Sequence, residues 1–166
     1  MADLSSRLTA AGTDLLGLRG ALVAGEPWPL SDNWGHTPEA EWGPREVLGH
    51  VDEMLPYWVD ELTRVIAGDG VTPVPFGRIA TDQSRLDRID ADRRLSSGEL
   101  LDSIDVGLKR TTAFVDGLSA ADLERVGAHP SRGELTVAES LERFLAGHLE
   151  DHVEQLRTTL GDGASG

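Results

Sequence analysis

The chain contains no cysteine. This absence excludes disulfide bonds, cysteine nucleophiles, thiolate metal ligands and iron–sulfur clusters held by cysteine. No apolar run approaches the roughly 18 residues that a transmembrane helix needs, so we expect no membrane span. Residues 1–7 carry no basic region followed by an apolar run, so we expect no signal peptide and a cytoplasmic protein.

Positive charge is also scarce. The sequence has 15 basic residues against 29 acidic ones, Lys109 is its single lysine, and the formal net charge is −14. Such a surface repels phosphate backbones and anionic lipid headgroups. We therefore expect no nucleic-acid partner and no membrane docking.

The residues that are present favour one compact helical domain. A chain of 166 residues with 39% hydrophobic residues can bury a single core, which we expect within residues 1–160, followed by a flexible tail at 161–166. No segment alternates apolar and polar residues as a strand does. Apolar residues instead recur at helical spacing in four segments. These segments cover about residues 3–24, 44–67, 96–118 and 136–160.

This pattern predicts an all-α protein, a four-helix bundle with a long loop between the second and third helices, at about 69–95. Within that loop, 82–89 could form a short helix. The tryptophans of residues 26–42 indicate a second loop that packs over one end of the bundle. Pro56 lies inside the second helix and predicts a kink or bulge near Asp52.

Two histidines interrupt the apolar stripe of the last helix. His148 and His152 are four residues apart, so both rings lie on one helix face. They occupy positions that continue the rhythm of Leu141 and Leu145. Burying two imidazoles without partners costs free energy, and a metal ion is a natural partner for neutral imidazole.

A third histidine, His50, also lies at the apolar face of its helix. His50 follows Val47 by three residues and precedes Met54 by four, on or beside the buried stripe of the second helix. Three protein nitrogens with one open position are typical of a catalytic zinc site. The alternative is three separate histidines, each hydrogen-bonded to a carbonyl or a carboxylate.

Other helical metal motifs do not fit. The zincin pattern needs an acidic residue directly after the first histidine, where the chain has Leu149. Di-iron bundles need a glutamate three residues before the histidine, and that position is Leu145 before His148 and Val47 before His50. Neither class of site is therefore expected.

Three features resemble the DinB/YfiT-like family of metal-dependent bundle proteins. The first is the spacing of Trp42 and His50 at the start of the second helix, and the second is the long loop after that helix. The third is the run at 146–156, which contains both His148 and His152. The resemblance extends from residue 1 to about residue 160.

The resemblance implies an up-down-down-up bundle, often dimeric, so a homodimer is expected. It implies a divalent metal, zinc or nickel, held by one histidine of the second helix and the H-x3-H pair of the fourth. Matched to this sequence, those ligands are His50, His148 and His152. It also implies a transferase or isomerase that uses a low-molecular-weight thiol such as mycothiol, bacillithiol or glutathione.

The expected function is thiol S-transfer to a small electrophile. A bound cation lowers the pKa of a coordinated water or thiol, and the thiol must be a cosubstrate because the chain has no cysteine. The alternatives are a metal-dependent hydrolase and a non-catalytic metal- or ligand-binding bundle.

Two residues outside the expected ligand set are candidates for positioning a ligand or binding substrate, and two other histidines are not expected to bind the metal. Gln155, three residues after His152, could orient a ligand or that imidazole, or pack at the bundle edge. Arg85 and its neighbouring arginines could hold a substrate carboxylate or form a salt-bridged, solvated face. His36 and His129 are expected to be loop histidines without a metal role.

Overall fold

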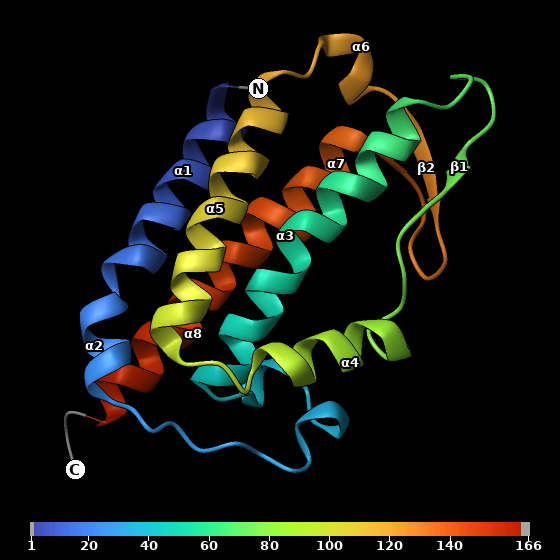
Figure 1. Cartoon of the computed structure of the whole chain (residues 1–166). Coiled ribbons are helices and arrows are strands. Elements are labelled where there is room, and N and C mark those ends of the chain that lie inside the picture. Colours follow the sequence, from blue (N-terminus) through green and yellow to red (C-terminus); the bar gives the residue numbers. More distant parts are fainter. Residues whose placement is uncertain (1, 164–166) are drawn as a thin grey trace.

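The computed structural model of the chain describes residues 2–163, most of which are helical (Figure 1). Four long helical segments pack side by side, and the predicted all-α four-helix bundle is confirmed. The segments are α1 Ala2–Gly17 with α2 Arg19–Ala24, then α3 Pro44–Ile66, then α5 Ser97–Asp116, and last α7 Val137–Leu141, a π-helical turn at Glu142–Ala146 and α8 Gly147–Gly163.

The direction of the helices explains the long middle loop. Figure 1 shows α3 and α5 running in the same direction, opposite to α1 and α8, which is the expected up-down-down-up order. Both α5 and α8 pack against α1 and α3. Because α3 and α5 are parallel, the chain must return along the bundle, and 23 helical residues span about 34 Å. Residues 67–96 make that return.

The returning segment has structure of its own. It contains the short strand β1 Val74–Pro75 and the helix α4 Gln83–Asp92, whose N-cap Asp82 accepts a hydrogen bond from the Arg85 backbone. α4 packs closely on α3 at Gly49, where a Cβ would lie 3.0 Å from the Arg93 backbone nitrogen. A larger residue at that position would push the two helices apart.

A small sheet beside the bundle was not expected from the sequence. After α6 Ala120–Leu123, the strands β2 Val126–His129 and β3 Gly133–Thr136 form an antiparallel hairpin, and β1 pairs with β2 in parallel. Strands of two to four residues are too short to show alternation. The expectation of no strands was therefore wrong here, although the sheet stays an appendage of the bundle.

The core is the apolar interior of the four helical segments. In the first helical segment, Leu8, Leu15 and Leu22 recur at helical spacing and are fully buried. α3 buries four polar or charged side chains within a single stretch. These are Glu46, His50, Asp52 and Glu53. Among the described residues, no helix is both long and apolar enough to cross a membrane.

Several expected boundaries need correction. α8 continues to Gly163, so residues 161–163 are helical, and the remainder of the expected tail, 164–166, lies outside the described residues. α3 passes through Pro56 without a break, so the bulge expected near Asp52 is absent. The irregular turn lies instead at 142–146, ahead of α8.

Candidate metal centre

α3 brings His50 into the bundle. The helix begins at Pro44, a residue that suits the first helical position because its missing N–H has no intrahelical partner there. His50 then shares an inner face with Val47 and Met54, both buried. The residue is 4% exposed, so its ring nitrogens must find partners inside the protein.

α8 contributes the other two histidines. His148 and His152 stand one turn apart, flanked by the buried side chains of Leu149 and Val153. His152 is 3% exposed, whereas 31% of the His148 side chain is exposed. The π-helical turn ends directly before α8, and such turns are frequent at functional sites.

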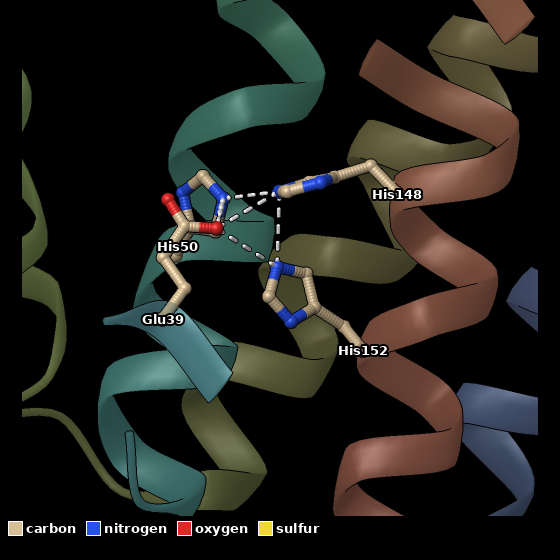
Figure 2. A group of neighbouring side chains, drawn as sticks. All are labelled: Glu39, His50, His148 and His152. Atoms are coloured by element: carbon tan, nitrogen blue, oxygen red, sulfur yellow. Dashed lines mark hydrogen bonds and ion pairs between the residues drawn. The ribbon is translucent and has the colours of Figure 1, made fainter. Parts of the chain in front are cut away.

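The three rings converge through their Nε2 atoms (Figure 2). His148 Nε2 lies 2.9 Å from His50 Nε2 and 3.1 Å from His152 Nε2. The ring planes are nearly perpendicular, at 82–84° to one another. This arrangement directs three nitrogens of two helices at one point, as the sequence analysis expected.

A fourth group, Glu39, joins the cluster and was missed by the sequence analysis. Its Oε2 atom lies 3.3 Å from His148 Nε2 and 3.8 Å from Nε2 of both His50 and His152. Figure 2 shows this carboxylate facing the three rings. Glu39 begins the short 3-10 turn Glu39–Glu41 in the loop before α3, where no helical period marks it.

The loop is anchored to the bundle by tryptophans and by Gln155. The buried Trp42 donates its indole N–H to the Trp34 carbonyl at 2.7 Å. The Gln155 amide donates to the carbonyls of Glu39 and Trp42 at 2.8 and 3.1 Å. The expected packing of this aromatic loop over the bundle end is present, and it carries Glu39 to the histidines.

Gln155 also orients His152. Because the amide nitrogen of Gln155 donates to two carbonyls, its oxygen faces His152 Nδ1 at 3.0 Å and must accept. His152 therefore carries its proton on Nδ1, and the Nε2 lone pair points into the cluster. Such a partner fixes the tautomer of a metal-ligating histidine.

Two further contacts hold the opposite side of the cluster. Arg85 pairs with Glu39 Oε1 and donates to the Ala80 carbonyl at 2.9 Å. Glu53 pairs with Arg78 and places its Oε2 atom 3.7 Å from His50 Nδ1. Arg85 thus lies at the cluster, where its guanidinium contacts a protein carboxylate.

The protonation of the cluster suits cation binding. Burial lowers the pKa of His50, although Glu53 partly opposes the shift, and burial lowers the pKa of His152 to about 3. Burial raises the pKa of Glu39, but His148, His50 and Arg85 more than reverse this, so its pKa lies well below the usual value. At neutral pH, His50 and His152 are neutral and Glu39 is ionised, the forms that bind metals.

Comparison with known proteins places this chain in a family. The family model described as the DinB superfamily matches residues 8–156. The chain belongs to the DinB superfamily. No functionally curated protein matches the sequence.

A solved structure shares the DinB-like fold. The chain is similar to YfiT from Bacillus subtilis, described as "a probable metal-dependent hydrolase with an unusual four-helix bundle topology". The two superpose with a TM-score of 0.59 over 93% of this chain and 87% of YfiT, at 16% sequence identity. At this identity the likeness supports the fold and says nothing further of the site.

The cluster of this DinB superfamily chain fits a divalent metal ion. Nitrogens about 2.1 Å from one ion, at bond angles of about 90–109°, lie about 3.0–3.4 Å apart, close to the observed 2.9 and 3.1 Å. All four candidate ligand atoms lie within 4.8 Å of one another. Three imidazoles and one carboxylate are a donor set that zinc and nickel accept. Within residues 2–163, no other group of at least three such side chains meets this criterion.

A pocket of about 400 Å³ opens on the cluster. Glu39, His50 and His148 line one part of it, and Trp58 and Phe144 line another. This volume lies within the range of small-molecule sites. His152 is not among the residues that line the pocket.

The two remaining histidines lie apart from the cluster. His36 is an exposed residue of the 3-10 turn Trp34–His36. His129 was expected in a loop, but it ends β2 and is 6% exposed. Its ring stacks on Phe144 and Trp58 at the far part of the pocket.

Proposed function

We propose that His50, His148 and His152 hold one divalent metal ion, zinc or nickel, with the Glu39 carboxylate beside it, and that the protein is a metal-dependent enzyme acting on a small molecule. The observation that carries this proposal is the convergence of three imidazole nitrogens on one point beside an open pocket. The imidazoles of His50 and His152 are buried and neutral, and their Nε2 atoms face only the cluster, which favours a cation between the rings.

When bound, such a metal would polarise a substrate oxygen and lower the pKa of a coordinated water or thiol. Two side chains of the protein orient the groups around the metal site. Gln155 keeps the His152 proton on Nδ1 and the Nε2 lone pair free. Arg85 binds Glu39 Oε1 and keeps the carboxylate aimed at the histidines, so that its Oε2 atom can accept a proton from the nucleophile.

Hydrolysis is the reaction that Glu39 favours. An ionised carboxylate 3.3 Å from a ligand nitrogen, beside an open pocket, is placed to take a proton from an attacking water. The likeness to YfiT, described as a probable metal-dependent hydrolase, agrees with this choice.

Thiol S-transfer is the second candidate. The complete absence of cysteine means that a thiol nucleophile would have to enter as a cosubstrate of the mycothiol, bacillithiol or glutathione type. The open pocket leaves room for such a group beside His50 and His148. The remaining alternative is a bundle that binds a metal or a ligand without catalysis. We also propose that the protein is a homodimer, which light scattering would measure.

The test combines metal analysis with product analysis. The purified protein should hold about one metal ion per chain. Its turnover of an ester and electrophile panel should require that metal and be lost in His152→Ala. His36→Ala removes an exposed histidine and should behave as wild type. Full metal content in His152→Ala would refute the site.

Isotope labelling separates the two reactions. Hydrolysis should incorporate ¹⁸O from labelled water without any thiol, whereas S-transfer should proceed only when a thiol is supplied and should yield a thioether or thioester. Metal-loaded protein that turns over nothing, with or without thiols, would favour the binding bundle.

A further inference from the structure

Two arginines differ from every other basic side chain in residues 2–163. The side chains of Arg132 and Arg143 make no hydrogen bond or ion pair, and Arg143 has a longer-range electrostatic interaction with Glu139. The other arginines and Lys109 each contact a carboxylate or a backbone carbonyl. With 29 acidic residues in the chain, carboxylate partners are abundant. Two unpaired guanidinium groups are therefore unusual in this molecule.

Both unpaired arginines line the pocket that opens on the histidine cluster. They come from separate elements. Arg132 lies in the turn between β2 and β3, which Gly133 completes with a φ of 75°, a backbone conformation that favours glycine. Arg143 lies in the π-helical turn before α8. Both side chains thus belong to short, well-defined turns beside the pocket.

The remaining charges of the pocket are neutralised in pairs. Arg78 pairs with Glu53, and Arg85 pairs with Glu39. The lining therefore has an excess of positive charge, carried by Arg132 and Arg143, on a chain whose net charge is −14. Such a local excess attracts an anion. The loop arginines that the sequence suggested as carboxylate binders are engaged within the protein.

The pocket also has an apolar wall. The rings of Trp58 and Phe144 are stacked, with centroids 4.3 Å apart and planes 5° apart. Met54 lines the same pocket, and so does Ile79, which is 48% exposed. A ligand with an apolar body would cover this surface.

We propose that the substrate class is an organic anion: an apolar body lies against Trp58 and Phe144, and its carboxylate binds Arg132 and Arg143. The reacting group then faces the histidine cluster at the other part of the pocket. Arginine suits this role because its planar fork binds a carboxylate through two charge-assisted hydrogen bonds. The inference rests on the proposed function for what happens at the cluster, but the binding step stands without it.

The experiment compares two probes of equal shape by calorimetry on the full-length protein as purified. 3-Phenylpropionate carries the anion, and 3-phenylpropionamide does not. Wild type should bind the carboxylate about tenfold more tightly. Arg132→Gln/Arg143→Gln should lose this preference and leave amide binding unchanged. Arg132→Lys/Arg143→Lys, which keeps the charges, should retain part of it.

Arg110→Gln is the matched control, since it removes an exposed arginine that pairs with Asp60 and lies outside the pocket lining. This variant should keep the wild-type preference. Equal affinity of wild type for both probes would overturn the inference, as would a preference retained by the double glutamine variant. An equal loss in Arg110→Gln would also overturn it, because the effect would then be one of overall charge.

Failure of this inference and failure of the proposed function are distinguishable. The binding assay scores the anion preference whether or not turnover is found. Metal content is measured on the same samples, and the double glutamine variant should keep the wild-type value, because neither arginine contacts the cluster.

Discussion

Histidine side chains lie at both ends of the pocket, and the angles between their rings and the neighbouring rings differ. In the cluster, the rings of His50, His148 and His152 meet at 82–84°, so their Nε2 atoms converge. At the other end, His129 lies at 22° to Phe144 and 27° to Trp58. There the ring presents its face to its neighbours, as another aromatic side chain would.

This difference shows that burial alone does not distinguish a metal-binding histidine from one that only packs against its neighbours. His50, His152 and His129 are all buried, and burial lowers the pKa of each. The direction of the nitrogen lone pairs separates a metal ligand from a packing group. His129 Nδ1 faces the Ser131 backbone N–H at 3.3 Å, away from any other histidine. Substitutions at the two ends should therefore have different consequences.

The largest contrast is expected in metal retention. His148→Ala removes a converging nitrogen and should weaken metal binding by more than about 100-fold, beyond the range seen for partners outside the ligand shell. His129→Ala should leave the metal content unchanged, although it removes a stacked ring. Elemental analysis after dialysis gives both numbers. Comparable loss in the two variants would erase the distinction between the two ends.

Turnover should depend on the charge of Glu39. Glu39→Gln keeps the size of the side chain and removes the proton acceptor, so we expect kcat to fall by about 100-fold. Metal content should change far less, because three imidazoles remain. Glu41→Gln, in the same 3-10 turn but outside the cluster, is the matched control. An unaltered kcat in Glu39→Gln would mean that this carboxylate has a structural role and accepts no proton in the reaction.

A smaller effect is expected from the group that orients His152. Gln155→Ala removes the acceptor for Nδ1–H and two hydrogen bonds to the Glu39 loop. We expect metal affinity to fall by about tenfold, within the range for such partners. Gln83→Ala deletes an exposed glutamine of α4 and should have no effect. Competition with a chromophoric chelator measures both affinities.

Much of the bundle and part of the cluster could be predicted from the sequence because both follow helical periodicity. The spacing of His148 and His152, and of His50 within its stripe, places each ring on an inner face. The capping boxes at Ser96 and Thr136 likewise mark the starts of α5 and α7.

The rest depends on contacts between distant segments. Glu39 lies in a loop whose position is set by tryptophan packing and by Gln155, 116 residues away in sequence. The π-helical turn at 142–146 contains neither proline nor glycine, so no residue marks it, whereas Pro56 is accommodated without a break. The pairing of β1 with β2 joins strands too short to predict.

The smallest expected effect is in acid stability, at the stacked end of the pocket. Burial lowers the pKa of His129, with Arg132 and Arg143 adding to the shift, so the folded state binds fewer protons there than the unfolded state does. The neutral His129 side chain therefore contributes to stability fully above the unfolded pKa of about 6.5, and this contribution is lost as pH falls below that value.

His129→Phe keeps a ring for stacking and removes the titration. Between pH 7 and pH 5, its urea midpoint should therefore fall less than that of wild type, by about 0.3 M or less, since exposed arginines are screened by solvent. His36→Phe, which alters an exposed histidine, should follow wild type. A larger acid-induced fall in His129→Phe than in wild type would mean that the protonated imidazole is stabilised at this end, and that stacking does not hold it neutral.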